Sequence, residues 1–150
     1  MSDLPIKFHG RLYPTDDGVK DKNWGFTRDE ANNMNLTGKP IWLEHEEPAV
    51  GEITNSYVDK EGWLVIDGQI WSKDKIGDME EKVRAMLKSG ELKDLSIGWV
   101  GKQSGGKILP NTKRFVEATL TSQGFFEGTN LLSVRCSRES SEQQVLRAQG

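Results

Sequence analysis

Short segments in which apolar and polar residues alternate recur along the 150-residue chain and predict a β-rich fold. The segments with this character are 6–12, 41–45, 50–56, 95–100, 113–121 and 131–136. Residues 63–71 form the most apolar run, so we expect a buried central strand there that pairs with 50–56 as a hairpin. Residues 46–48 are expected to break the chain between two short strands, and 101–111 to form a loop.

The hydrophobic period changes to three and four residues between 73 and 89, which predicts one amphipathic helix. Gly90 is a natural residue to end it. Thr27 and Glu30 have the spacing of a capping box and predict a short helix over 28–34. Together with sixteen glycines, these patterns favour a mainly β fold with α (α+β): a single small β-barrel, closed or nearly closed.

Ser96 lies on one of the predicted strands, between the packing residues Leu95 and Ile97. Alternation places Ser96 and Gly98 on the face opposite these apolar side chains, where we expect Ser96 to be accessible. Gly98 would leave room for another chain to approach closely. A small hydroxyl on a rigid strand is a candidate nucleophile, and it is equally an ordinary strand serine.

Glu117 lies on a strand whose polar face, like that of Ser96, is expected to point away from the core and towards solvent. His45 ends a strand and shares a face with Ile41 and Leu43, which permits a place at the edge of the core. His9 falls on a polar face and is expected to be solvated.

A metal site at residues 44–47 is disfavoured because adjacent residues on an extended chain point in opposite directions. No second histidine lies at ligand spacing. The single cysteine, Cys136, excludes an internal disulfide and a cysteine-based zinc site; it is expected to be a buried, inert thiol.

The net charge of −3 gives no sign of a nucleic-acid partner. No apolar run approaches the length of a membrane span, and the N-terminus lacks the plan of a signal peptide, so we expect no membrane association and no secretion. Residues 1–136 are expected to form one barrel domain, and the polar residues 137–150 a disordered tail or linker.

The order His45, Ser96, Glu117, with the segments around each residue, resembles the capsid-maturation (prohead) serine proteases of tailed phages and the related herpesvirus assemblins. Residues 40–45 and 49–53 are similar to the family's histidine segment, and 61–68 to the strand that follows it. Residues 87–98 match the phage pattern of a helix end, a glycine, a short turn and Leu-Ser-Ile-Gly. Residues 115–120 resemble the phage segment in which an acid precedes a small residue; assemblins have a second histidine there.

The resemblance implies a serine endopeptidase in which Ser96 is the nucleophile, His45 the general base and acid, and Glu117 the acid that orients the histidine. Asp94 and Glu52 are alternative candidates for the third role. No Gly-x-Ser-x-Gly segment is present, which disfavours an α/β-hydrolase.

The resemblance also implies partners and a place of action. The expected substrates are viral scaffold and major capsid proteins, including copies of the protease itself. The expected location is the host cytoplasm or the interior of the procapsid. A homodimer is plausible, and no metal or organic cofactor is implied.

A backbone donor for the oxyanion is expected at Phe125, in the glycine-bounded segment 124–128. The next assemblin position is an arginine that holds a water, and here it is Phe126. An ordinary hairpin turn with two packing phenylalanines is the alternative. In the tail, residues 145–148 resemble an assemblin cleavage sequence that would end a product at Ala148.

A non-catalytic barrel that binds scaffold or capsid protein is the competing function. In that case the three side chains need not meet, so their convergence is the discriminating observation. A third and weaker alternative is an unrelated β-barrel hydrolase or a cysteine enzyme using Cys136.

Overall fold

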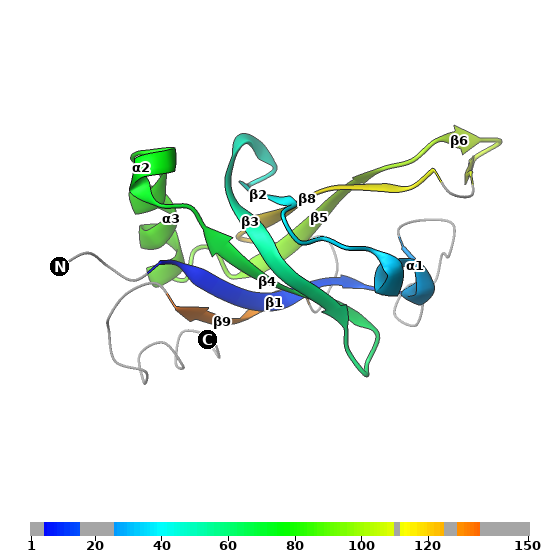
Figure 1. The fold of residues 1–150 in the computed structure, drawn as a ribbon, viewed down its shortest axis with the longest axis horizontal. Helices are drawn as coiled ribbons and strands as arrows, with labels where there is room; N and C mark the ends of the chain where they lie inside the picture. Colours follow the sequence, from blue (N-terminus) through cyan, green and yellow to red (C-terminus); the bar gives the residue numbers. More distant parts are fainter. Residues whose placement is uncertain (1–4, 16–25, 110–111, 125–128, 136–150) are drawn as a thin grey trace.

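The computed structural model describes residues 5–15, 26–109, 112–124 and 129–135, which form one curled β-sheet with short helices at its ends (Figure 1). The strands run in the order β5-β8-β2-β3-β4-β1-β9. Their bounds are β1 Lys7–Pro14, β2 Pro40–Leu43, β3 Glu46–Val58, β4 Trp63–Ile70, β5 Asp94–Val100, β8 Arg114–Thr121 and β9 Asn130–Arg135. The helices are α1 Arg28–Asn33, α2 Lys73–Ile76 and α3 Met79–Lys88.

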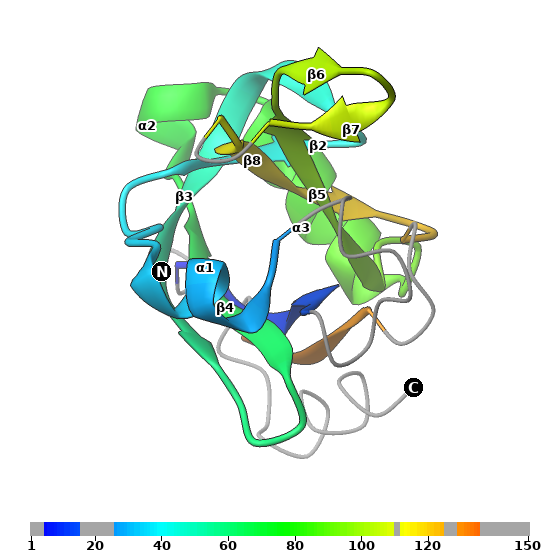
Figure 2. The same ribbon diagram turned by 90° about the vertical axis from the view of Figure 1, so that its right-hand side faces the viewer.

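The sheet curls until its two edge strands approach each other, which confirms the prediction of a nearly closed barrel. At one end Leu131 N, on β9, donates to Lys93 O, just before β5, at 2.9 Å. Across the interior, a Cβ at Gly10 would lie 2.8 Å from Leu95 Cδ1, so a glycine on β1 makes room for β5. Figure 2 looks through the resulting ring of strands. The core fills this ring with fully buried aliphatic side chains such as Leu12, Ile41, Ile53, Ile66, Leu95 and Leu120.

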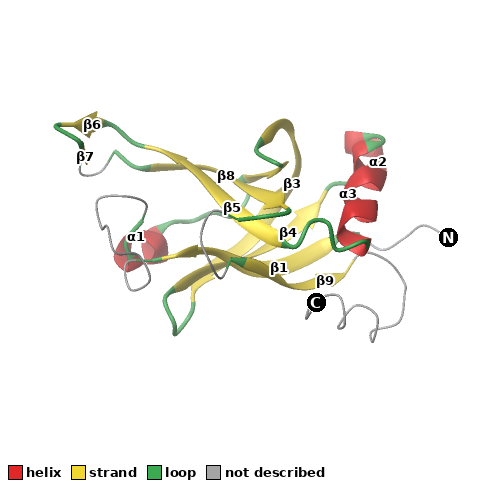
Figure 3. Cartoon of the chain, turned by 180° about the vertical axis from the view of Figure 1, so that it is seen from behind, coloured by secondary structure: helices red, strands yellow, loops and turns green. Residues whose placement is uncertain are grey.

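Hydrogen bonding between neighbouring strands is antiparallel except where β2 runs parallel to β8, with Ile41 opposite Ala118 and Leu43 opposite Leu120. The predicted hairpin of 50–56 with 63–71 is confirmed as the β3–β4 pair. β3 runs without interruption from Glu46, so the expected break at 46–48 is wrong. The expected loop at 101–111 contains a small hairpin, β6 (Gln103–Ser104) with β7 (Lys107–Ile108), which projects beyond the barrel (Figure 3).

The amphipathic helix predicted over 73–89 is present but divided. Gly77 adopts a φ of +61°, which interrupts the helix between α2 and α3. Val83 and Leu87 of α3 are buried, as the period predicts. The short helix α1 begins as predicted, because Thr27 Oγ1 accepts from Glu30 N and Glu30 Oε1 accepts from Thr27 N. In the part of the chain described here, no helix is long and apolar enough to span a membrane.

Candidate active site

A tight turn between β2 and β3 carries His45. Glu44 and His45 form the whole connection, since Leu43 pairs with Glu46 across the hairpin. Both residues have positive φ, +51° and +59°, which is the requirement of a type I′ turn. The expectation that His45 continues a strand face with Ile41 and Leu43 is therefore wrong, because β2 ends at Leu43 and the turn redirects the histidine.

Strand β8 holds this turn in place through two hydrogen bonds. His45 N donates to Thr119 Oγ1 at 2.7 Å, and Glu44 N donates to Leu120 O at 3.0 Å. Left-handed backbone is unfavourable for residues with a Cβ, so the turn needs such contacts to persist. The parallel pairing of β2 with β8 thus fixes His45 beside Thr119.

The β5–β8 pairing places Ser96 and Glu117 on one face. Ser96 lies opposite Thr119, and Gly98 lies opposite Glu117. Residues opposite each other on antiparallel strands share a face, so the side chains of Ser96, Thr119 and Glu117 all point to the side of the sheet on which His45 lies. The common face of Ser96 and Glu117 agrees with the alternation of their strands.

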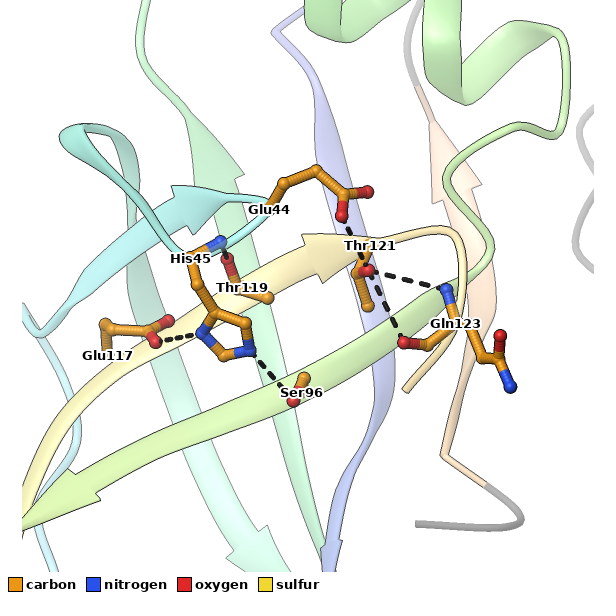
Figure 4. A network of polar contacts seen from close by, with 7 residues as sticks. All are labelled: Glu44, His45, Ser96, Glu117, Thr119, Thr121 and Gln123. Atoms are coloured by element: carbon orange, nitrogen blue, oxygen red, sulfur yellow. Dashed lines mark hydrogen bonds and ion pairs between the residues drawn. The ribbon is translucent and has the colours of Figure 1, made fainter. Parts of the chain in front are cut away.

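The three side chains converge (Figure 4). His45 Nδ1 lies 2.6 Å from Glu117 Oε1, and His45 Nε2 lies 3.1 Å from Ser96 Oγ. The geometry favours the tautomer in which Nδ1–H donates to the carboxylate and Nε2 accepts from the serine hydroxyl. Glu117, His45 and Ser96 therefore form a continuous hydrogen-bonded chain, drawn from three separate elements of the barrel.

The expected exposure of Ser96 and Glu117 is wrong. Ser96 is only 6% exposed and Glu117 only 2% exposed, whereas the His45 side chain is 47% exposed. The β2–β3 turn is the reason, because it lays the imidazole over a face that alternation alone assigns to solvent. The outward edge of the histidine is the open side of the site.

Gly98 makes room within the protein. A Cβ at position 98 would lie 2.9 Å from Glu117 Cδ, which is closer than real Cβ contacts permit. The sequence predicted that Gly98 would admit another chain, but the Glu117 carboxyl fills the space. The glycine is therefore required by the placement of Glu117.

Burial raises the pKa of the Glu117 carboxyl above its ordinary value, and the hydrogen bond and charge of His45 act in the opposite direction. Glu117 Oε2 is buried and has no hydrogen-bond partner in the described part of the chain. In that part of the chain, the hydrogen bond with His45 Nδ1 is the polar contact that the carboxyl makes.

The other acids considered for the third position lie elsewhere. Asp94 Oδ2 accepts from Gly124 N at 3.0 Å, and Glu52 pairs in register with Pro40, at the far end of β2 from the turn. His9, expected to be solvated, has its Nδ1 2.7 Å from Asp67 Oδ1, its cross-strand partner. Phe125, Phe126, Cys136 and the tail segment 145–148 lie outside the described residues.

The sequence interpretation missed Thr119, which lies on β8 and bonds the turn, and Glu44, which lies in the turn and bonds the end of β8. Its one available signal was the two-residue spacing of Glu117, Thr119 and Thr121, which places three polar side chains on one face. Among the described residues, no group of three or more histidine, cysteine, aspartate or glutamate side chains could hold a metal ion.

Comparison with known proteins identifies the fold. No protein-family profile and no curated protein matches the sequence. Among solved structures, a Kaposi's sarcoma-associated herpesvirus (KSHV) protease in complex with a hexapeptide phosphonate inhibitor aligns with a TM-score of 0.62 at 13% identity, covering 97% of this chain and 75% of that one. Varicella-zoster virus protease aligns with a TM-score of 0.55 at 14% identity, covering 97% and 75%. KSHV protease in complex with a dimer disruptor aligns at 0.55 and 17% identity, covering 95% and 80%. The chain shares its fold with the herpesvirus proteases.

Proposed function

We propose that this protein is a serine endopeptidase with Ser96 as nucleophile, His45 as general base and acid, and Glu117 as orienting acid. The observation that carries the proposal is the unbroken hydrogen-bonded chain from Glu117 through His45 to Ser96. A serine hydroxyl is a weak nucleophile until a neighbouring base takes its proton, and here the base is already in contact with it.

In the first half of the reaction, Ser96 Oγ attacks the carbonyl carbon of the scissile peptide while His45 Nε2 takes the hydroxyl proton. The tetrahedral intermediate then collapses. The C–N bond breaks, His45 Nε2–H protonates the departing amine, and the acyl group stays on Ser96 as an ester.

In the second half, water takes the place of the amine. His45 Nε2 removes a proton from the water as its oxygen attacks the ester carbon, and the same proton returns to Ser96 Oγ when the acyl group leaves as a carboxylic acid. The atoms balance as the addition of one water across one peptide bond, with no oxidant or reductant.

Glu117 holds the imidazole in the productive tautomer and stabilises its positive charge during both halves. Its burial matters because a charge interaction is stronger where water is excluded. The exposed edge of His45 leaves the side of substrate approach open.

The fold shared with herpesvirus proteases, one of them in complex with a peptide phosphonate, supports a role in viral capsid maturation. The substrates would then be scaffold and capsid proteins inside an immature particle, including the protease's own precursor. A KSHV protease in complex with a dimer disruptor gives a reason to test for a homodimer here.

The competing function, a non-catalytic barrel, does not explain why the side chains of Glu117, His45 and Ser96 converge. The test is digestion of a random peptide library by wild-type protein and by Ser96→Ala, both at concentrations high enough to dimerise, with products read by mass spectrometry. Cleavage by wild type alone supports the proposal. Absence of cleavage by folded wild type would favour the binding module, and equal cleavage by both would point to a contaminating protease.

A further inference from the structure

Glu44 occupies the other position of the turn that carries His45, and its carboxylate binds the last residue of β8 and the residue that follows it. Thr121 Oγ1 donates to Glu44 Oε2 at 3.0 Å, and Ser122 N donates to Glu44 Oε1 at 3.0 Å. Each carboxylate oxygen therefore has its own donor, one from a buried threonine and one from the backbone. Figure 4 shows the contact with the threonine.

These contacts extend the attachment of the turn along β8. The His45 amide bonds Thr119, the Glu44 amide bonds Leu120, and the Glu44 carboxylate bonds Thr121 and Ser122. A two-residue turn with both φ values positive suits asparagine and glycine, whereas Glu and His each carry the strain of a Cβ there. Contacts outside the turn must hold it, and the Glu44 carboxylate supplies two of them.

The segment that Glu44 binds is also tied to the strand of the nucleophile. Gly124 N donates to Asp94 Oδ2 at 3.0 Å, and Asp94 begins β5, two residues before Ser96. Thr121 Oγ1 in turn accepts from Gln123 N at 3.4 Å. Residues 121–124 therefore connect the turn of His45 to the start of the Ser96 strand.

We propose that Glu44 is a positioning residue, whose carboxylate locks the left-handed β2–β3 turn onto residues 121–122 and so keeps His45 Nε2 within hydrogen-bond distance of Ser96. This inference rests on the proposed serine hydrolase function. Glu44 touches none of the reacting atoms and acts through the turn.

A test can use a fluorophosphonate probe, which reacts when the serine oxygen attacks phosphorus and fluoride leaves, and which needs no knowledge of the substrate. The rate of labelling of the whole chain would be followed by intact mass for wild type, Glu44→Ala, Glu44→Gln, Thr121→Val and the double variant Glu44→Ala/Thr121→Val. Glu47→Ala is the matched control, because it also removes an acid from this hairpin. The Glu47 side chain is exposed and makes no hydrogen bond in the described structure.

Glu44→Ala is expected to label roughly tenfold more slowly, the scale of a small misplacement of a catalytic base. Glu44→Gln should label at nearly the wild-type rate, because its amide oxygen can accept from Ser122 N while its NH₂ donates to the Thr121 hydroxyl. Thr121→Val should be slowed less than Glu44→Ala and should add nothing to it in the double variant. A wild-type rate in Glu44→Ala, a Glu44→Gln as slow as Glu44→Ala, a slowed Glu47→Ala, or effects that multiply in the double variant would each overturn the inference.

A second readout keeps this test separate from that of the proposed function. The ring ¹⁵N and Nδ1–H resonances of His45 report its contact with Glu117 whether or not the protein is an enzyme. They should shift or broaden in Glu44→Ala and stay unchanged in Glu44→Gln and Glu47→Ala. If wild type does not label, the proposed function fails, and an unchanged His45 spectrum in Glu44→Ala would overturn the positioning role independently.

Discussion

His45 Nδ1 lies 2.6 Å from Glu117 Oε1, although the two residues are 72 positions apart in the chain and the carboxylate is almost fully buried. A buried carboxylate is costly unless it is paired, and among the described residues His45 is the hydrogen-bond partner of Glu117. The pair therefore gives the clearest predictions.

Replacing Glu117 with glutamine should lower kcat/KM for any cleaved peptide by roughly 10³- to 10⁴-fold, because the amide can favour the wrong tautomer of His45. The decisive comparison is with Asp94→Asn and Glu52→Gln, which should both stay close to wild type, because the amide oxygen of Asp94→Asn can still accept from Gly124 N and Glu52 lies at the far end of β2. If Glu117→Gln keeps near-normal activity, or one of the other two loses it, the orienting role belongs elsewhere.

The same substitution should change how stability depends on pH. Because burial raises the pKa of Glu117 in the folded protein, the folded state binds more protons than the unfolded state above the ordinary glutamate value of 4.5. The free energy of unfolding of wild type should therefore fall, relative to that of Glu117→Gln, as pH rises from below 4.5 towards neutrality. Urea unfolding of both proteins across this range measures the difference. If the difference in the free energy of unfolding stays constant with pH, or grows in favour of wild type, the pKa of the Glu117 carboxyl is not raised in the folded protein. Ser96→Ala should follow wild type.

Gly98→Ala should displace the Glu117 carboxyl, because the added Cβ would lie 2.9 Å from Glu117 Cδ. Overpacking of this kind costs about 1–3 kcal/mol of stability, and the displaced acid should slow fluorophosphonate labelling as well. Val100→Ala, at an exposed position of the same strand, is the control. A folded Gly98→Ala that labels at the wild-type rate would mean that Glu117 tolerates the shift and that its placement is not critical.

Thr119→Val should weaken the attachment of the β2–β3 turn to β8, because valine has nearly the same shape as threonine but lacks its hydroxyl. The substitution removes the hydroxyl that accepts from His45 N at 2.7 Å and leaves that amide without its partner, at a cost of about 1–3 kcal/mol. The melting temperature and the labelling rate should both fall. Thr119→Ser, which restores the hydrogen-bond acceptor, should recover most of the labelling rate. If Thr119→Ser does not recover the labelling rate, the hydroxyl is not what holds the site, and the packing of the threonine methyl group, which serine lacks, matters instead.

Much of this site follows from the alternation of residues in strands. The common face of Ser96 and Glu117, the β3–β4 hairpin and the barrel class are all consequences of the period of two, and they agree with the structure. Alternation cannot show what covers a face, however. Both Ser96 and Glu117 are buried by a turn whose sequence, Glu-His, carries none of the usual asparagine or glycine signals of a type I′ hairpin.

The helix illustrates the same limit. The apolar period runs through residues 73–89 without a visible defect, yet Gly77 takes a positive φ and divides it. A glycine in a helical pattern is compatible with either outcome, and the packing of α3 against the barrel decides between them. Hydrogen bonds between side chain and backbone, such as those of Thr119 and Glu44, depend on register and turn geometry together.

The assignment of Ser96 and His45 can be tested by the mass of the intact protein after treatment with a fluorophosphonate, followed by peptide mapping, for wild type beside Ser96→Ala and His45→Ala. The proposed triad predicts a single adduct on Ser96 in wild type, none in Ser96→Ala, and labelling of His45→Ala slowed by orders of magnitude. Folded wild type that gains no adduct on Ser96, or a His45→Ala that labels as fast as wild type, would contradict it.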